Sequence, residues 1–301
     1  MPRPFDTIRT WGEMIKLSHS VFALPFALMA VFLAGRDVPG RHLPRPGHVL
    51  LVVACMVFAR SVAMTFNRIV DREIDARNPR TRDRPLPTGR LSLRAALFFC
   101  GFCIGGFLAC CTGFLWIYGN PWPTIAGAPV LAYLCGYSYA KRFTQWSHFY
   151  LGSALGLAPV AAWVAVHPAT LGWAALILMG AVTCWVAGFD ILYACQDVEV
   201  DRRDGLHSLP SRWGIGPALW AARACHAAAV LLFTLLGWIA PLGRPYLIGV
   251  AAVAVLLLVE NLLVRPDDLS RVNLAFFTVN GMVSVGLGVL AIIDVLLAVP
   301  P

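Results

Sequence analysis

Residues 170–201 read TLGWAALILMGAVTCWVAGFDILYACQDVEVD. The part up to Tyr193 is almost wholly apolar, and at a rise of about 1.5 Å per residue it can cross a hydrocarbon layer about 30 Å thick. Acidic residues gather where this run ends, at Asp190, Asp197 and Asp201. The segment therefore predicts a membrane-spanning helix with carboxylates at one end.

A second segment follows the same pattern. Residues 48–75, HVLLVVACMVFARSVAMTFNRIVDREID, also run from apolar to acidic. Three polar residues close each segment at spacings of four and four, namely Asn67, Asp71 and Asp75 in this one and Tyr193, Asp197 and Asp201 in the other. Residues four apart share one face of a helix, so each set is predicted to point one way. The match indicates two halves of one site and an internal repeat.

The composition of the whole chain agrees with a membrane protein. Of its 301 residues 58% are hydrophobic and only 13% are charged, against roughly 25% charged in soluble proteins. This excludes an ordinary soluble domain and a disordered chain. The net charge of +8 is interpreted as Lys and Arg facing anionic lipid or an anionic substrate, and not as a nucleic-acid surface.

Nine apolar runs predict an all-α integral membrane bundle of nine transmembrane helices. They lie near residues 18–35, 48–70, 93–112, 121–139, 148–166, 170–193, 217–239, 244–264 and 273–297. With nine spans, 18 of the 24 Lys and Arg residues fall on the side of the N-terminus, including Arg3, Lys16 and the loop from Asn67 to Arg94. Positive residues favour the cytoplasm, so a cytoplasmic N-terminus is predicted.

The paired carboxylates need a compensating cation, because like charges at a membrane edge are costly. Arginine side chains or Mg²⁺ could supply it, and the pattern alone leaves both open. Mg²⁺ prefers oxygen ligands and often joins carboxylates to substrate phosphates. The loop ARNPRTRDRPLPTG, residues 76–89, is rich in arginine. Its arginines could set membrane topology or hold a diphosphate in bidentate fashion.

At this point the motifs resemble a known family. NRIVDREID with its trailing RPLPTG resembles the NDxxDxxxD motif of the UbiA superfamily of intramembrane prenyltransferases, and YACQDVEVD resembles that family's YxxxDxxxD. The segment YSYAKRFT, residues 137–144, resembles the family's segment after the fourth helix. The likeness covers almost the whole chain and is greatest to the branch of 4-hydroxybenzoate polyprenyltransferases and MqnP-like enzymes. Arg68, Gln196 and His207 depart from residues common in relatives.

The resemblance implies one transmembrane prenyltransferase domain, residues 1–301, with cytoplasmic loops 67–94 and 196–216 capping the site. It implies Mg²⁺ on five residues: Asn67, Asp71, Asp75, Asp197 and Asp201. The metal would bind a polyprenyl diphosphate, and the ring of an aromatic acceptor would attack the allylic cation formed from it. Diphosphate contacts are expected, besides Asn67, from Arg72, Arg77, Arg84, Lys141 and Arg142. Lys141 or Arg142 could instead pair with the acceptor carboxylate. Asp190 and Tyr193 would orient the acceptor or stabilise the cation.

The implied function is prenylation of an aromatic acid, 4-hydroxybenzoate or a relative, in ubiquinone or menaquinone biosynthesis. The implied location is a bacterial cytoplasmic (inner) membrane, with the mouth of the site facing the cytoplasm. A naphthoate, porphyrin or glycerol phosphate acceptor is the alternative within the family. A cation-coupled transporter is the alternative outside it, although aspartates at one membrane edge beside an Arg-rich loop favour diphosphate handling. A CDP-alcohol phosphotransferase would carry a DGxxAR-type run, which this chain lacks.

Overall fold

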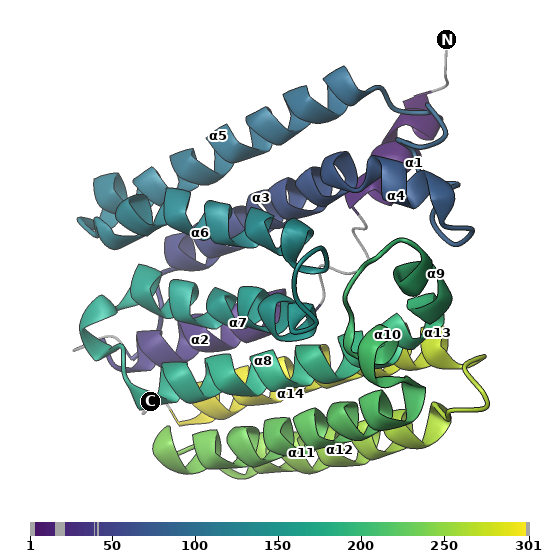
Figure 1. The fold of residues 1–301 in the computed structure, drawn as a ribbon. Coiled ribbons are helices and arrows are strands. Elements are labelled where there is room, and N and C mark those ends of the chain that lie inside the picture. Colours follow the sequence, from purple (N-terminus) through teal and green to yellow (C-terminus); the bar gives the residue numbers. More distant parts are fainter. Residues whose placement is uncertain (1–3, 16–21, 39, 41, 299–301) are drawn as a thin grey trace. The chain divides into compact units, whose positions relative to one another are not determined.

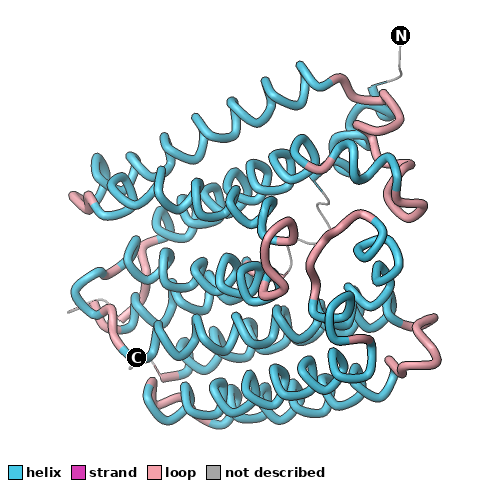
Figure 2. Tube along the Cα trace, in the orientation of Figure 1, coloured by secondary structure: helices cyan, strands magenta, loops and turns pink. Residues whose placement is uncertain are grey.

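The computed structural model describes residues 4–15, 22–38, 40 and 42–298, without the side chains that precede Thr10. Within this part of the chain every regular element is a helix (Figures 1 and 2), which confirms the all-α prediction. Arg3, Lys16 and the beginning of the first predicted span lie outside the described residues.

Seven described helical segments are long and apolar enough to cross a membrane. They are α3 (Pro46–Val70), α5 (Leu93–Tyr118), α7 (Ser147–Val166), α8 (Trp173–Ala194, with its continuation to Arg203), α11 (Ile215–Ile239), α12 (Arg244–Leu263) and the segment Val272–Leu297. The last comprises α13 (Val272–Leu274), a π-helical turn (Ala275–Val279) and α14 (Asn280–Leu297). Two further helices, α2 (Leu24–Arg36) and α6 (Trp122–Ala140), overlap the other two predicted spans. The protein is a multi-pass integral membrane protein, and the count of nine crossings stays a prediction.

The chain forms two compact units. One comprises the N-terminal segment to residue 20 and Val53–Tyr139, and the other comprises Val21–Val52 and Ala140–Pro301. In the first unit α3, α5 and α6 lie side by side (Figure 1). Small side chains meet aromatic ones in its core, as where Gly106 of α5 lies against the Phe58 ring of α3. The short helix α1 (Pro4–Ile15) buries Met14 beside Leu91 and Ala96.

The second unit packs around an aromatic core. Trp185 of α8 is fully buried, and its ring centroid lies 5.3 Å from that of Phe26 in α2. Phe26 in turn stacks on Phe233 of α11 at 5.6 Å. The Trp185 indole N–H donates to Asn280 of α14 at 2.7 Å, and Asn280 donates to Glu260 of α12 at 2.6 Å. Buried polar groups joined across helices in this way fix the mutual register of α8, α12 and α14.

Two glycines bring α7 and α8 together. Gly152 packs directly on the backbone carbonyl of Thr183. A β-carbon at Gly156 would lie 2.6 Å from the carbonyl oxygen of Met179, so that position also requires glycine. Small residues four apart let two membrane helices approach closely. This approach places the beginning of α7 against the end of α8, where the second acidic motif begins.

Candidate active site

Each acidic motif interrupts a helix at its middle aspartate. α3 ends at Val70, and Asp71, with φ −94° and ψ 6°, begins the six-residue helix α4 (Arg72–Arg77). α8 is followed by a 3₁₀ turn, Cys195–Asp197, and Asp197, with φ −104° and ψ 5°, begins the six-residue helix α9 (Val198–Arg203). Each aspartate occupies the N-cap position of the helix that follows it, without a capping hydrogen bond from its side chain. The continuous helical face predicted from the spacing is therefore broken at the same place in both motifs.

The four-residue register survives the break in the first motif. The Asp71 N–H donates to the Asn67 carbonyl at 2.9 Å, and the Asp75 N–H donates to the Asp71 carbonyl at 2.7 Å. The Asn67 side-chain amide donates to Asp71 Oδ2 at 2.8 Å. Asn67 and Asp71 are therefore joined through their side chains, whereas the spacing predicts only that they share a face.

Asp75 is buried between two arginines. Arg84 Nη1 donates to Asp75 Oδ1 at 2.7 Å, and Arg68 Nη1 lies 3.8 Å from Oδ2. Arg68 is only 5% exposed. Its position explains one departure noted in the sequence, because a second cation here neutralises the carboxylates of the motif. Arg84, predicted to hold diphosphate, is paired with a predicted metal ligand.

The Arg-rich loop after α4 is folded into tight turns. The Thr81 hydroxyl donates to the Asp75 carbonyl at 2.9 Å, and the Asn78 side chain accepts the Arg80 N–H at 2.9 Å. Arg90 holds Glu13 of α1 at 2.8 Å. These bonds place Arg84 next to Asp75.

The other predicted basic residues are found in different settings. Arg72 is exposed and pairs with Glu73 at 2.9 Å, and Arg77 and Arg142 are exposed. Lys141 Nζ lies 3.8 Å from Asp201 Oδ2 in the second unit. The structure thus brings Lys141 to the second motif and Arg84 to the first, and the phosphate contacts of all five stay predictions.

The second motif is closed by its own loop. Asp201 is 3% exposed, and its Oδ2 accepts the Ser208 hydroxyl at 2.7 Å. Ser208 also caps α10 (Leu209–Trp213), accepting the Ser211 N–H at 3.3 Å. The His207 N–H donates to the Lys141 carbonyl at 2.6 Å. The loop therefore folds back onto Asp201, as the Arg84 loop folds back onto Asp75.

Sequence reasoning missed His148. This side chain is fully buried at the beginning of α7, and its Nδ1 lies 2.7 Å from Asp190 Oδ2. Its Nε2 accepts the Leu209 N–H at 3.2 Å, so the proton of the neutral ring sits on Nδ1 and is donated to Asp190. A signal existed: His148 is one turn before Gly152 and two before Gly156, on the face that meets α8.

Tyr193 lies in an aromatic setting. Its ring is half-buried, with its centroid 4.3 Å from that of Phe276 in the π-helical turn. The predicted role of Tyr193 toward an acceptor or cation is untested by this contact.

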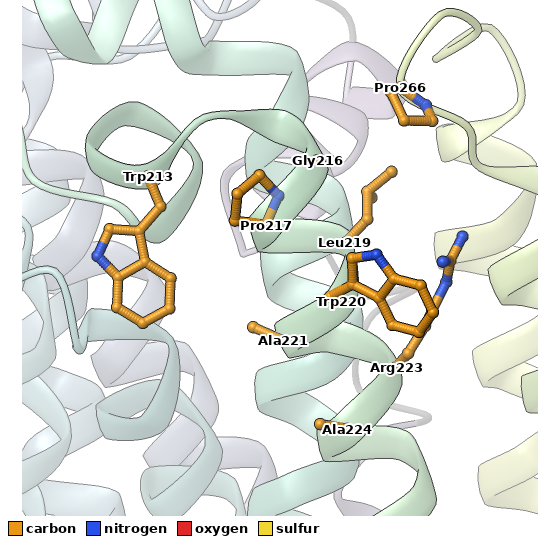
Figure 3. A pocket seen from close by; sticks show the side chains of 9 residues that line it. All are labelled: Trp213, Gly216, Pro217, Leu219, Trp220, Ala221, Arg223, Ala224 and Pro266. Atoms are coloured by element: carbon orange, nitrogen blue, oxygen red, sulfur yellow. The ribbon is translucent and has the colours of Figure 1, made fainter.

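An open hollow of about 750 Å³ lies elsewhere in the second unit (Figure 3). Trp213, Pro217, Trp220 and Arg223 line it, and the Arg223 guanidinium lies 4.7 Å above the Trp220 ring. No predicted site residue belongs to its lining.

The donor atoms suit a hard divalent cation. Within the described residues no three His, Cys, Asp or Glu side chains gather as a metal cluster. Asp75 Oδ2 is buried without a hydrogen-bond donor, an arrangement that leaves an oxygen available. An all-oxygen set of this kind matches Mg²⁺, which keeps several waters and needs few protein ligands. The motif residues therefore fit the predicted ion.

Fold and motifs together define a helical, multi-pass membrane protein with two acidic helix ends of matching local structure. The UbiA prenyltransferase family model matches residues 23–282, and the chain belongs to that family.

Individual relatives agree with this assignment. The chain is 32% identical to a 4-hydroxybenzoate octaprenyltransferase of Nitrosococcus oceani, over 94% of this chain and 96% of the relative. The apo structure of a UbiA homologue from Aeropyrum pernix is 31% identical, with a TM-score of 0.81 over 92% of this chain and 98% of that one. A UbiA homologue from Archaeoglobus fulgidus, bound to GPP and Mg²⁺, is 19% identical with a TM-score of 0.68, over 94% and 99%, and shares the fold.

Proposed function

We propose that the protein transfers a polyprenyl group from polyprenyl diphosphate to the ring of 4-hydroxybenzoate or a closely related aromatic acid, with Mg²⁺ as cofactor. The main support for this proposal is that two helices end in the same way. In each, an aspartate (Asp71 or Asp197) lies at a break in the helix, and a buried aspartate (Asp75 or Asp201) follows four residues later. The similarity to the Nitrosococcus oceani enzyme over nearly the full length of both chains supports the acceptor.

Asn67, Asp71, Asp75, Asp197 and Asp201 are the residues that would hold the metal. Bound Mg²⁺ supplies positive charge that offsets the charge of the departing diphosphate. This role requires the two motifs to share one site, which the common form of their local structures favours. A UbiA homologue of the same fold, from Archaeoglobus fulgidus, has been solved with GPP and Mg²⁺ and with DMAPP and Mg²⁺.

Arg84 and Lys141 would bind the diphosphate beside the metal ligands. A guanidinium has five N–H donors, so Arg84 can hold Asp75 at 2.7 Å and still donate to a phosphate oxygen. Lys141 stands near Asp201 in the same way. Each cation is positioned by a buried carboxylate, which limits the entropy lost when phosphate binds. Arg72, Arg77 and Arg142, which are exposed, would add contacts once substrate is present.

Asp190 and Tyr193 would face the acceptor or the allylic cation. Asp190 precedes Asp197 by seven residues, about two helical turns or roughly 10 Å, a separation suited to an acceptor ring beyond the diphosphate. Apolar helices around such a site would exclude water, which would otherwise capture the cation. The polyprenyl tail would extend among apolar helices toward lipid.

The remaining parts of the proposal concern organisation. Loops 67–94 and 196–216 would cap one site in a single domain. The mouth would face the cytoplasm of a bacterium, with the protein in its inner membrane, because 18 of the 24 Lys and Arg residues lie on that side in a nine-span topology. The product would enter ubiquinone or menaquinone biosynthesis.

The test is a membrane-fraction assay with Mg²⁺, a radiolabelled polyprenyl diphosphate and a panel of aromatic acids. Label should move to 4-hydroxybenzoate in the wild type and in Glu199→Gln, a control at an exposed neighbouring position. Asp71→Asn and Asp197→Asn should lose transfer. Label on a naphthoate alone would change the acceptor. No transfer to any acceptor, together with unchanged diphosphate binding in both aspartate variants, would refute the proposal and favour a transporter.

A further inference from the structure

We propose that His148 is a positioning residue that holds Asp190 and the loop of the second acidic motif in one arrangement. The inference rests on the proposed function and deepens it, since it assigns a task to a residue outside both motifs. His148 would set the acceptor side of the site through Asp190 and the diphosphate side through Ser208 and Asp201.

Two hydrogen bonds hold the imidazole ring of His148. Nδ1 of His148 donates to Asp190 Oδ2 at 2.7 Å, and Nε2 accepts the Leu209 N–H at 3.2 Å. A neutral imidazole has one donor and one acceptor. Both are used here, on opposite sides of the ring, by two different elements of the unit. One side chain of α7 thus ties the end of α8 to the beginning of α10.

The His148 ring is buried among apolar side chains. Leu209, Ile191 and Leu192 belong to one buried apolar cluster, and the His148 side chain itself has no exposed surface. Water therefore cannot reach the His148 ring and replace its two hydrogen bonds. A buried donor left without a partner costs more than the net value of a hydrogen bond, so loss of His148 displaces the segment that carries the Leu209 N–H.

Ser208 connects the Leu209 backbone to the second acidic motif. Ser208 precedes Leu209, and its hydroxyl donates to Asp201 Oδ2 at 2.7 Å. The same hydroxyl accepts the Ser211 N–H at 3.3 Å. Movement of the Leu209 backbone must therefore change the contact that orients Asp201. Asp190, by contrast, is bonded to Nδ1, the other nitrogen of the His148 ring.

The two contacts can be separated by substitution. An asparagine at position 148 carries an amide nitrogen close to the place of Nδ1, so His148→Asn keeps a donor for Asp190 and loses the acceptor for Leu209. A glutamine reaches the place of Nε2, so His148→Gln keeps the acceptor and loses the donor. His226→Asn is the matched control, because His226 is 2% exposed in the same unit and bonds Asn261 of α12 at 2.7 Å instead.

Three measurements on detergent-purified full-length protein distinguish the variants. Amide hydrogen exchange in residues 206–213 reports the loop. Binding of farnesyl thiodiphosphate with Mg²⁺, a poorly reacting analogue, reports the diphosphate side without turnover. The KM for the aromatic acid reports the acceptor side in the transfer assay.

We expect His148→Asn to raise exchange in the loop and weaken analogue binding about tenfold, the factor that corresponds to about one lost hydrogen bond, with an acceptor KM within about twofold of wild type. His148→Gln should leave exchange and analogue binding unchanged and raise the acceptor KM about tenfold. The control should resemble wild type in all three.

Equal effects of both His148 variants in every measurement, or no effect of either, would overturn the inference. Hydrogen exchange and analogue binding need no catalysis, so they test the positioning role of His148 independently of the proposed transfer reaction. If wild type transfers no label to any aromatic acid while the variants still divide in exchange and binding, the proposed acceptor chemistry fails and the positioning role stands. If wild type transfers label and the variants do not divide, the acceptor chemistry stands and the positioning role fails.

Discussion

Replacing Arg84 with methionine tests whether burial, and not distance, decides the strength of an ion pair in this protein. Two pairs in the first unit have almost the same geometry: Arg84–Asp75 at 2.7 Å and Arg90–Glu13 at 2.8 Å. Their surroundings differ. The Asp75 and Arg84 side chains are 8% and 19% exposed, whereas those of Glu13 and Arg90 are 35% and 43% exposed.

The expected magnitudes follow from this difference. Removing one partner of a buried pair costs about 3–5 kcal/mol when the other is left uncompensated. Here Arg68 remains 3.8 Å from Asp75, so we expect Arg84→Met to lower the unfolding free energy by about 2 kcal/mol, near the value of one charged hydrogen bond. Arg90→Met should cost at most about 1 kcal/mol, as exposed pairs do.

Thermal unfolding of the purified protein in detergent measures both. Using about 2–4 °C per kcal/mol, Arg84→Met should lower the Tm by roughly 4–8 °C and Arg90→Met by less than about 4 °C. Asp75→Asn removes the buried charge, so adding Arg84→Met to it should lower the Tm by less than Arg84→Met does alone. A loss for Arg84→Met no larger than that for Arg90→Met, or one of equal size in the Asp75→Asn background, would refute the reasoning.

Other substitutions probe the site and the packing. Asp197→Asn should reduce transfer about a hundredfold or more by removing a charged ligand while keeping its shape, and its apparent Mg²⁺ requirement should rise; an unchanged Mg²⁺ titration would contradict a ligand role. Asn280→Leu should lower unfolding free energy by about 2–4 kcal/mol, because a buried indole N–H and a carboxylate lose their partner; a Tm within about 2 °C of wild type would count against it. Gly152→Ala should force α7 from α8, since a methyl group would meet the Thr183 carbonyl, and lower the yield of folded protein; Gly105→Ala, with open space around it, is the control and should fold normally.

The sequence predicted the helices well because membrane helices are defined by length and polarity. The predicted run 244–264 corresponds to α12 at Arg244–Leu263, and 148–166 to α7 at Ser147–Val166. Local composition decides such segments, since every backbone group in lipid must be bonded within the helix. The four-residue spacing of Asn67 and Asp71 predicted a shared helix face, and their side chains lie 2.8 Å apart.

Properties that depend on tertiary packing could not be predicted. The bond of Ser208 to Asp201 depends on how the loop folds back, and the place of His148 before two glycines indicates a helix contact without indicating that its partner is Asp190. The pairing of Arg84 with Asp75 depends on turns within the loop.

The burial of α2 has a consequence for how the protein is made. α2 has only 13 residues, and eight of them are buried in the second unit. Among its neighbours is α14, whose Ser284 donates to the carbonyl of Phe22 at 2.8 Å and whose Gly288 lies against Pro25. The ribosome must add everything from Asp37 to Val279 before α14 begins, which takes roughly 10–50 s at about 5–20 residues per second. During that interval α2 can already pack on α7, which is synthesised before α14, but its contacts with α14 are still missing. A membrane segment that is synthesised early thus completes its packing only when one of the last segments of the chain arrives.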